Sequence, residues 1–285
     1  DAQIESAKFR NYTYQRVDID GLWSKGEFEG KVNSEDVNAN LALDGLVNFS
    51  EPNMVYQFEA QIDTLDLKRL GLLQQDLRIY DLALESDLKG QDFNLLDGSI
   101  FIQNIHLESD TFKFELDSMR LSLLQKANDK KRLSLNSDLI TAQIEGYFNP
   151  LEVSDMMLEY VNDHFNIAEF LDNSEERLAM KRPQTFSRTA ASDSITPEYD
   201  FTINAGNIVP LTQLFVPELK QLDTLYLEGR FNEKDEFLHF DSYIPKVIYG
   251  DLVLDGVELK TAGDEDEINL AFRVNGIKIG SNVRL

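Results

Sequence analysis

The chain has 285 residues, of which 42% are hydrophobic and 27% are charged, a composition typical of globular rather than disordered or fibrous proteins. Its formal net charge of -24 argues against nucleic acid as a partner, because phosphate binding depends on clustered Lys and Arg. The lack of cysteine rules out disulfides and thiolate metal sites, and no apolar run approaches the roughly 18 residues of a membrane-spanning helix.

Strict alternation of apolar and polar residues dominates the first third of the chain. It runs through residues 37–49 and returns in residues 54–62, after a turn-forming stretch at 50–53. A period of two predicts half-buried strands, and two such strands around a turn predict a hairpin. The apolar residues predicted to share one face are Val37, Ala39, Leu41, Leu43, Val47, Phe49, Tyr56, Phe58, Ala60 and Ile62.

Further strands are predicted between short polar breaks, and such breaks favour a meandering antiparallel order. In the first β block, residues 1–148, they cover 77–88, 98–107, 112–124, 132–136 and 139–148. The third of these places Phe112, Phe114 and Leu116 on its apolar face. In the second β block, residues 199–285, the strands cover 199–204, 225–232, 237–244, 247–259 with a break, 267–274 and 276–285.

A short phrase recurs along both blocks: an aliphatic residue, an acidic or polar residue, then Gly. Asp-Gly and Asn-Gly suit tight turns, whereas Gly inside unbroken alternation marks a bulge or a bend. Because residues 41–49 keep their parity through Gly45, bends in a curved sheet are favoured. The alternative is that Asp-Gly is simply a common dipeptide in β proteins.

Residues 149–172 are predicted to form an amphipathic helix. Asn149 can cap it, Pro150 suits its first turn, and the apolar residues follow helical spacing. Two roles stay open for this helix: a cap on the end of the sheet core, or a plug over an apolar groove. The predicted plug residues are Met156, Met157, Tyr160 and Phe165. Residues 173–198 lack periodicity and are predicted to be a flexible linker, while 65–72 and 208–217 suit short helical insertions.

No constellation of residues suggests catalysis. The only histidines are His106, His164 and His239, and none lies in a nucleophile, zinc or phosphate-binding signature. With 51 Asp and Glu, carboxylate pairs are too common to single out, and the acidic run at 264–267 suits a solvated hairpin tip. We therefore predict a non-enzymatic protein with no catalytic, cofactor-binding or metal-binding residues.

The opening residues carry a family resemblance. Residues 11–21 (NYTYQRVDIDG), followed by 25–30 (KGEFEG), resemble repeats in the TamB proteins of Bacteroidota and, more distantly, in the AsmA-like superfamily. The similarity is strongest over residues 4–107 and looser over 139–165 and 199–259. The chain lacks the family's amino-terminal membrane anchor and carboxy-terminal domain, so the resemblance implies an internal segment.

The resemblance implies a long curved antiparallel sheet folded over an apolar groove, often called a β-taco. It implies a periplasmic segment of an inner-membrane-anchored protein that binds or conducts phospholipid, or another acyl lipid, for outer-membrane biogenesis. A further implied partner is an outer-membrane barrel protein, through parts not present here. The residues themselves also leave open a structural or adhesive β-sandwich and a carbohydrate-binding β domain.

Overall fold

The computed structural model describes residues 2–9, 12–74, 76–110, 113–150, 153, 196–206, 208–209, 218–235, 237–263 and 268–279. Within these residues the protein is almost entirely β, with a single antiparallel sheet and two short 3-10 helices. The strands are β1 Ala2–Phe9, β2 Tyr12–Ser24, β3 Glu27–Asp36, β4 Ala39–Asn48, β5 Met54–Asp66, β6 Arg78–Gly90, β7 Leu96–Glu108, β8 Lys113–Gln125, β9 Lys131–Ser137, β10 Ile140–Tyr147, β11 Glu198–Ala205, β12 Leu219–Leu222, β13 Leu225–Asn232, β14 Phe237–Tyr249, β15 Leu252–Gly263 and β16 Ile268–Ile279. The 3-10 helices are η1 Phe93–Leu95 and η2 Ala127–Asp129.

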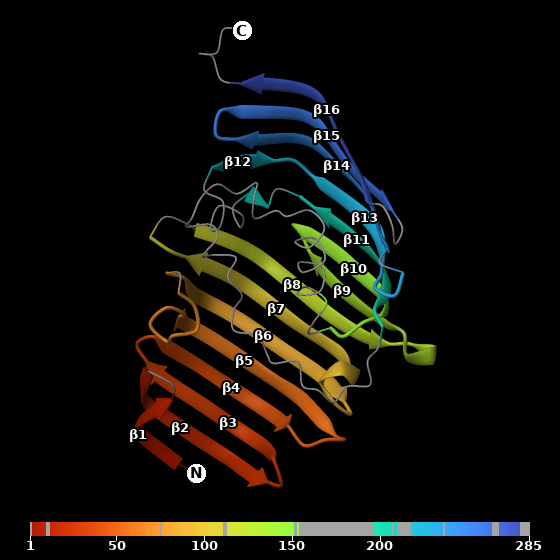
Figure 1. Cartoon of the computed structure of the whole chain (residues 1–285). Helices are drawn as coiled ribbons and strands as arrows, with labels where there is room; N and C mark the ends of the chain where they lie inside the picture. Colours follow the sequence, from red (N-terminus) through yellow and green to blue (C-terminus); the bar gives the residue numbers. More distant parts are fainter. Residues whose placement is uncertain are drawn as a thin grey trace.

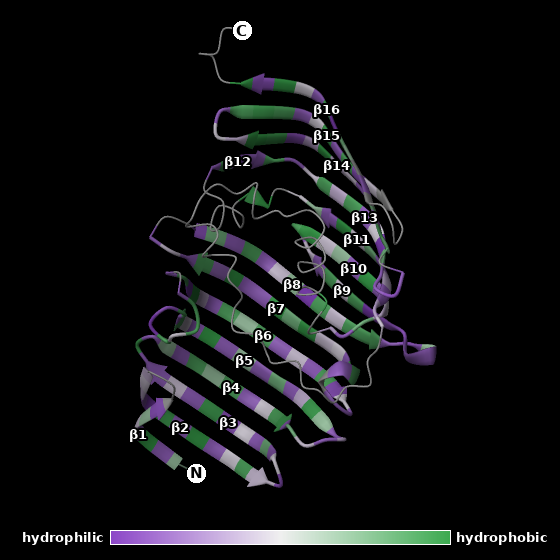
Figure 2. Cartoon of the chain, viewed as in Figure 1, coloured by the Kyte–Doolittle hydropathy of each residue, from purple (hydrophilic) through white to green (hydrophobic). Residues whose placement is uncertain are grey.

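The strands follow one another across the sheet in chain order, so the predicted meander is confirmed. Only β12 lies off this path, where it pairs with the end of β14. The sheet is open and twists along its length, with β1 and β16 as its two edge strands (Figure 1). Apolar and polar residues alternate along most strands, as the colour bands in Figure 2 show.

The two predicted β blocks belong to one continuous sheet. Strands β10 and β11 pair over eight residues, from Ile140 opposite Ala205 to Tyr147 opposite Glu198. Glu198, which we assigned to the linker, is therefore the first residue of a strand. Strands β10 and β11 are therefore neighbours in the sheet although about 50 residues separate them in the chain.

Strand β14 corrects the predicted strand end at Ile244, because the strand continues through Pro245 to Tyr249. The break predicted inside 247–259 lies at Gly250, whose φ of +55° suits glycine, and β15 begins after it at Leu252. On one side β14 pairs with β13 as far as Tyr243 and then with β12 from Val247. Pro245 lies between these two partners, where the strand makes no ladder bond, so its missing N–H has no cost there.

Three other boundaries differ from the predictions. The two strands expected at 267–274 and 276–285 form the single strand β16, because Gly276 continues the ladder opposite Asp255. The insertion predicted at 65–72 is a turn rather than a helix, although Leu70 N donates to Asp66 O over 3.0 Å. Strands β1–β3 and β12 were not predicted: no strand was assigned before residue 37, and the four residues of β12 show too little alternation.

Little of the predicted helix lies within the described residues. Val153 is helical, and its N–H donates to Asn149 O over 3.1 Å, which is one helical turn at the expected start. Residues 154–195, which include most of the predicted helix and linker, lie outside the described residues. In the 208–217 insertion only 208 and 209 are described, with Val209 helical.

The recurring glycines lie inside strands, as the unbroken alternation predicted. Gly45 occupies the middle of β4, and a Cβ added there would lie 2.3 Å from Gln57 O in β5. Gly30 and Gly21 continue this position into β3 and β2, so three glycines lie side by side. The strands approach so closely here that only glycine fits. The seven glycines of the phrase are Gly21, Gly45, Gly98, Gly146, Gly229, Gly256 and Gly276.

Candidate functional site

One face of the sheet, the apolar face, carries rows of mostly apolar side chains across the strands, interrupted by Ser34 and Ser86. In the central row of β2–β8, each residue pairs in register with the next, so the row crosses seven strands. Its members are Ile19, Val32, Leu43, Ala60, Leu84, Ile102 and Met119. All seven are only partly buried. Six steps between strands make the row about 29 Å long.

The predicted lining residues of β4 and β5 do share this face. Leu41 pairs with Ile62, Leu43 with Ala60, and Val47 with Tyr56. Phe58 pairs with Gly45, and Phe49 contacts Tyr56 edge-to-face with ring centroids 5.7 Å apart. The cross-strand register therefore brings together the apolar residues that alternation had grouped strand by strand.

The alternation changes phase towards one end of β5–β8, which simple parity does not anticipate. The β4–β5 register shifts between Asn40 and Leu41, and Asp81 and Asn104 adopt positive φ in β6 and β7. The shift gives β5 one extra residue opposite β4, and β6–β8 stay in register with β5, so the next apolar side chains of all four strands return to the same face. Phe114 and Leu116 of β8 follow this shifted phase and pair with Leu107 and Ile105.

Val37 is the exception among the described lining residues. It lies in the turn between β3 and β4, and its side chain is 80% exposed, so the strand begins at Ala39 rather than at Val37. The turn is held by Asp36, whose carboxylate accepts a hydrogen bond from Asn38 N over 2.8 Å. Phe112 and the four predicted plug residues, Met156, Met157, Tyr160 and Phe165, lie outside the described residues.

The carboxylate of Asp36 is a polar anchor that alternation could not identify. It is 1% exposed and accepts hydrogen bonds from the Tyr12 hydroxyl at 2.5 Å and from Gln15 N at 2.9 Å. Burial alone would raise the pKa of Asp36, but these donors outweigh it and lower the pKa below its ordinary value. Asp36 therefore ties β2 to the β3–β4 turn as a buried anion.

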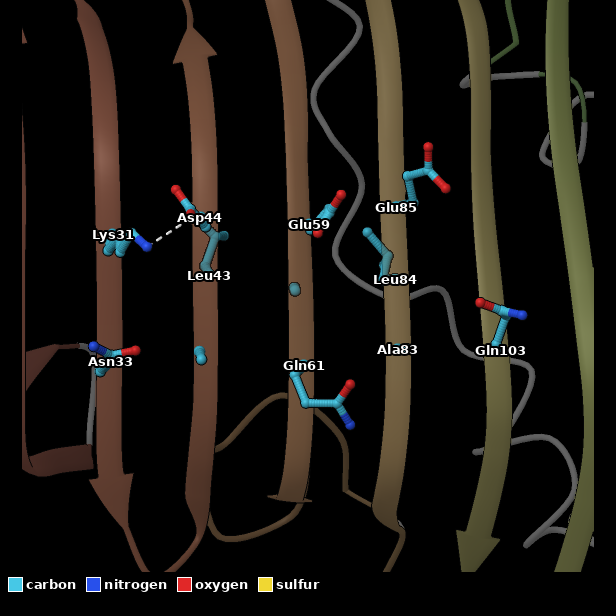
Figure 3. Close-up of a pocket in the computed structure, with 12 residues that line it drawn as sticks. Lys31, Asn33, Leu43, Asp44, Glu59, Gln61, Ala83, Leu84, Glu85 and Gln103 are labelled. Atoms are coloured by element: carbon cyan, nitrogen blue, oxygen red, sulfur yellow. Dashed lines mark ion pairs between the residues drawn. The ribbon is translucent and has the colours of Figure 1, made fainter.

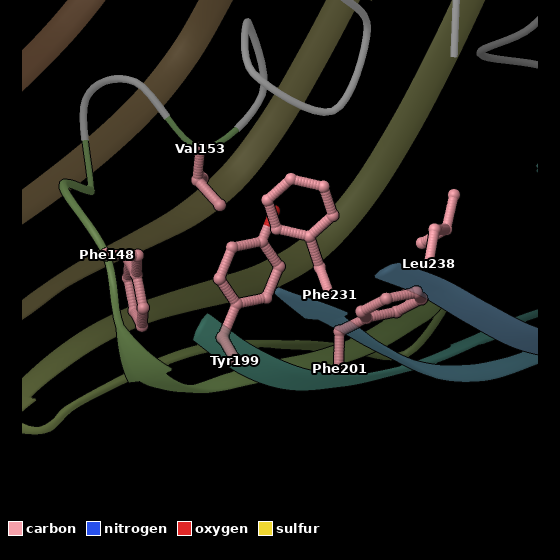
Figure 4. Packing of buried hydrophobic residues seen from close by; sticks show 6 residues of the cluster. All are labelled: Phe148, Val153, Tyr199, Phe201, Phe231 and Leu238. Carbon is pink, nitrogen blue, oxygen red and sulfur yellow. The ribbon is translucent and has the colours of Figure 1, made fainter. Parts of the chain in front are cut away.

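A second region of the same face is closed by packing. The side chains of Phe148, Val153, Tyr199, Phe201, Phe231 and Leu238 form the aromatic cluster at β10–β14 (Figure 4). Tyr199 is 1% exposed, and its ring lies 5.3 Å from that of Phe231 and 5.8 Å from that of Phe148. Burial raises the pKa of Tyr199, and its hydroxyl has no hydrogen-bond partner among the described residues.

Lys131 adds a buried cation beside the aromatic cluster. It is fully buried and pairs across Gly146 with the strand that carries Tyr199. Its Nζ donates to Phe148 O over 3.0 Å, and desolvation lowers the pKa of the ammonium group. The bond holds the end of β10 where the chain turns towards Val153.

The opposite face, the polar face, carries a hollow of about 530 Å³ over β3–β7. Short side chains at Ala42 and Ala83 form its floor, and the Lys31–Asp44 ion pair, with 3.0 Å between Nζ and Oδ2, lies at one side. Figure 3 shows longer polar side chains, such as Gln61, spread around this strip. Two predicted lining residues, Leu43 and Ala60, also border the hollow.

The two described histidines do not form a cluster with catalytic geometry. His106 Nδ1 lies 3.9 Å from Asp81 Oδ2, and His239 Nδ1 lies 2.6 Å from Thr261 O. Within the described ranges, no group of three or more His, Asp or Glu side chains could hold a metal ion. No helix in the described part of the chain is long and apolar enough to cross a membrane.

The comparisons with known proteins found no family model that matches the chain, and no match among curated proteins or solved structures.

Proposed function

We propose that the apolar face over β2–β8 binds the acyl chains of lipids. The observation that supports this proposal is the central row, which stays apolar over seven strands and only partly buried. A hydrocarbon core of about 30 Å holds two leaflets, so one acyl chain extends about 15 Å and fits within the row of about 29 Å. Each methylene group taken out of water contributes about 0.8 kcal/mol.

The charge distribution supports the same occupant. The central row contains no charged residue, whereas the neighbouring row on the polar face carries Lys31, Asp44, Glu59 and Glu85. The uncharged central row suits the acyl chain of a lipid, while the lipid head group would remain in water outside the row. An open single sheet also favours this function over a β-sandwich, which needs a second, facing sheet.

We further propose that the chain is a non-enzymatic segment of an envelope protein that carries phospholipid between membranes for outer-membrane biogenesis. The resemblance of residues 4–107 to TamB and AsmA-like repeats supports this setting. In such a protein the strands would curve around the apolar rows to form a groove, in which lipids move from strand to strand in the periplasm. A barrel protein of the outer membrane would be contacted through other parts.

Two alanines on opposite faces offer a matched test. Ala60→Asp places a charge in the central row between Leu43 and Leu84, whereas Ala42→Asp places the same charge on the polar face of the adjacent strand. Binding of a fluorescent C16 fatty-acid probe is measured by titration. Ala60→Asp is expected to weaken binding about tenfold, roughly 1.4 kcal/mol, and Ala42→Asp to leave it unchanged.

Native mass spectrometry of the chain, purified from a cell that contains phospholipid, provides the direct check. Co-purified phospholipid is expected on the wild-type chain and at reduced occupancy on Ala60→Asp. The proposal fails if the wild-type chain carries no lipid and does not bind the probe, or if the two variants bind it equally.

A further inference from the structure

A row of uncharged, exposed side chains crosses the polar face from β9 to β14. The cross-strand pairs are Asn136 with Thr141, Thr141 with Asn204, Asn204 with Tyr226, and Tyr226 with Tyr243. We call these five residues the neutral row. Four steps between strands give it a length of about 19 Å. All five side chains are exposed, including 38% of Tyr226 and 44% of Tyr243.

The neutral row differs in charge from the residues of β3–β8 that lie in register with it. Those residues are mostly charged, with Lys31, Asp44, Glu59, Glu85 and Arg120. From β9 to β14 the charges stop, in a chain whose net charge is -24. The next row is uncharged over β10 and β11, with Gln143 opposite Thr202, and continues as Glu228 and Asp241 on β13 and β14. The neutral row therefore suits an uncharged ligand, and the two carboxylates beside its tyrosine end are acceptors for hydroxyl groups.

The hydrogen-bonding groups of the neutral row are largely unused by the protein. The side chains of Asn136, Thr141, Asn204 and Tyr243 have no hydrogen-bond partner among the described residues, while the Tyr226 hydroxyl donates to Glu228 Oε2. Amides and hydroxyls both donate and accept hydrogen bonds. They are therefore available to a ligand that carries many hydroxyl groups.

The two tyrosines give the row an aromatic end. They are directly opposite each other on β13 and β14, so their side chains stand side by side on the polar face. A tyrosine ring offers a large, rigid apolar surface with one polar end. Such a surface complements the C–H face of a pyranose ring, and the strand spacing of about 4.8 Å is close to the length of one sugar unit in an extended chain.

We propose that the neutral row binds a linear, uncharged polysaccharide with extended β-linkages, which lies across the strands. The tyrosines stack on consecutive sugar rings, and the amide and hydroxyl side chains of β9–β11 bind the hydroxyl groups of the following units. The Glu258–Arg273 pair, with 3.4 Å between Oε2 and Nη1, bounds the row beyond Tyr243. This site is separate from the acyl-binding surface, because it lies on the other face.

Isothermal titration with cellohexaose and with the hexamer of N-acetylglucosamine tests the proposal. The wild-type chain is expected to bind at least one of them, and Tyr226→Ala and Tyr243→Ala are each expected to weaken binding about tenfold, roughly 1.4 kcal/mol. Tyr243→Phe keeps the ring and is expected to retain most of the affinity. Leu22→Ala, a change at a 75% exposed residue of β2, is the control and is expected to bind normally.

Circular dichroism and binding of the C16 probe show that each variant is folded, since the tyrosines are not on the apolar face. The proposal is overturned if the wild-type chain binds neither sugar at millimolar concentration, or if the double variant of both tyrosines binds as tightly as the wild type. A wild-type chain that binds the sugar but not the C16 probe would instead contradict the proposed acyl-binding function alone.

Discussion

The β2–β8 part of the apolar face and the aromatic cluster at β10–β14 are built from the same alternation but are buried to different extents. Leu84 in β6 is only partly buried, whereas Leu238 in β14 is 2% exposed and packs among aromatic rings. A strand's own sequence determines which side chains share a face, while neighbouring parts of the chain determine how deeply that face is buried. Among the described residues, the aromatic cluster provides stability, and the partly buried β2–β8 rows are those for which we propose a ligand.

The largest expected effect is in the aromatic cluster. Phe231→Ala removes a ring that is 3% exposed and contacts Tyr199, so it is expected to lower the free energy of unfolding by about 4 kcal/mol. Urea denaturation measures the change. A loss below about 1 kcal/mol would show that the cluster is not the stable core of the sheet.

A smaller effect is expected from the glycines that lie side by side in β2–β4. Gly45→Ala forces a Cβ to within 2.3 Å of Gln57 O and is expected to cost about 2 kcal/mol. Gly206→Ala is the control, because a Cβ there would lie 3.5 Å from Leu139 O, an ordinary contact. Equal urea midpoints for the two variants would contradict the close approach of β4 and β5.

At the edge of the β2–β8 region, the hydrogen bonds of Asp36 provide stability that the aromatic cluster gains from apolar packing. Asp36→Asn is expected to cost about 1.5 kcal/mol at pH 7, because the buried carboxylate loses its charge-assisted bonds. Since folding lowers the pKa of Asp36, its stabilising effect is present above the ordinary pKa of 3.8 and is lost as the pH falls through the lower folded value.

The gap in unfolding free energy between wild type and Asp36→Asn should therefore close in acid. Asp44→Asn changes a carboxylate whose side chain is 58% exposed, and this control should differ little from wild type at any pH. A gap that persists unchanged below pH 3 would show that the charge of Asp36 is not responsible.

The smallest effect is expected at Leu84, and Leu238 of the aromatic cluster is its matched comparison. Leu84→Ala is expected to cost about 1 kcal/mol in urea denaturation, because its side chain already contacts water. Leu238→Ala, the same change at a 2% exposed residue, is expected to cost about 3 kcal/mol. Similar costs for the two variants would mean that the apolar face is equally covered in both regions.

Most strands could be predicted from the sequence, because alternation depends on residues close in the chain. Val37 was misplaced since a β-branched residue of the right parity also fits a turn. Strand β14 was predicted to end at Ile244, because its neighbours β12 and β13 are known only in three dimensions. The phase change at Asp81 and Asn104 was likewise hidden. Cross-strand features such as the neutral row depend on register, which a single strand does not reveal.

The contacts between elements are concentrated between strands that are hydrogen-bonded neighbours, and nearly all of these are consecutive in the chain. The stability of such a meander is therefore close to a sum of terms for each hairpin and for its contacts with the hairpins before and after it, as in repeat proteins. Insertion or deletion of a whole hairpin would lengthen or shorten the sheet while leaving both faces in phase. The length of such a sheet can therefore change during evolution while its fold stays the same.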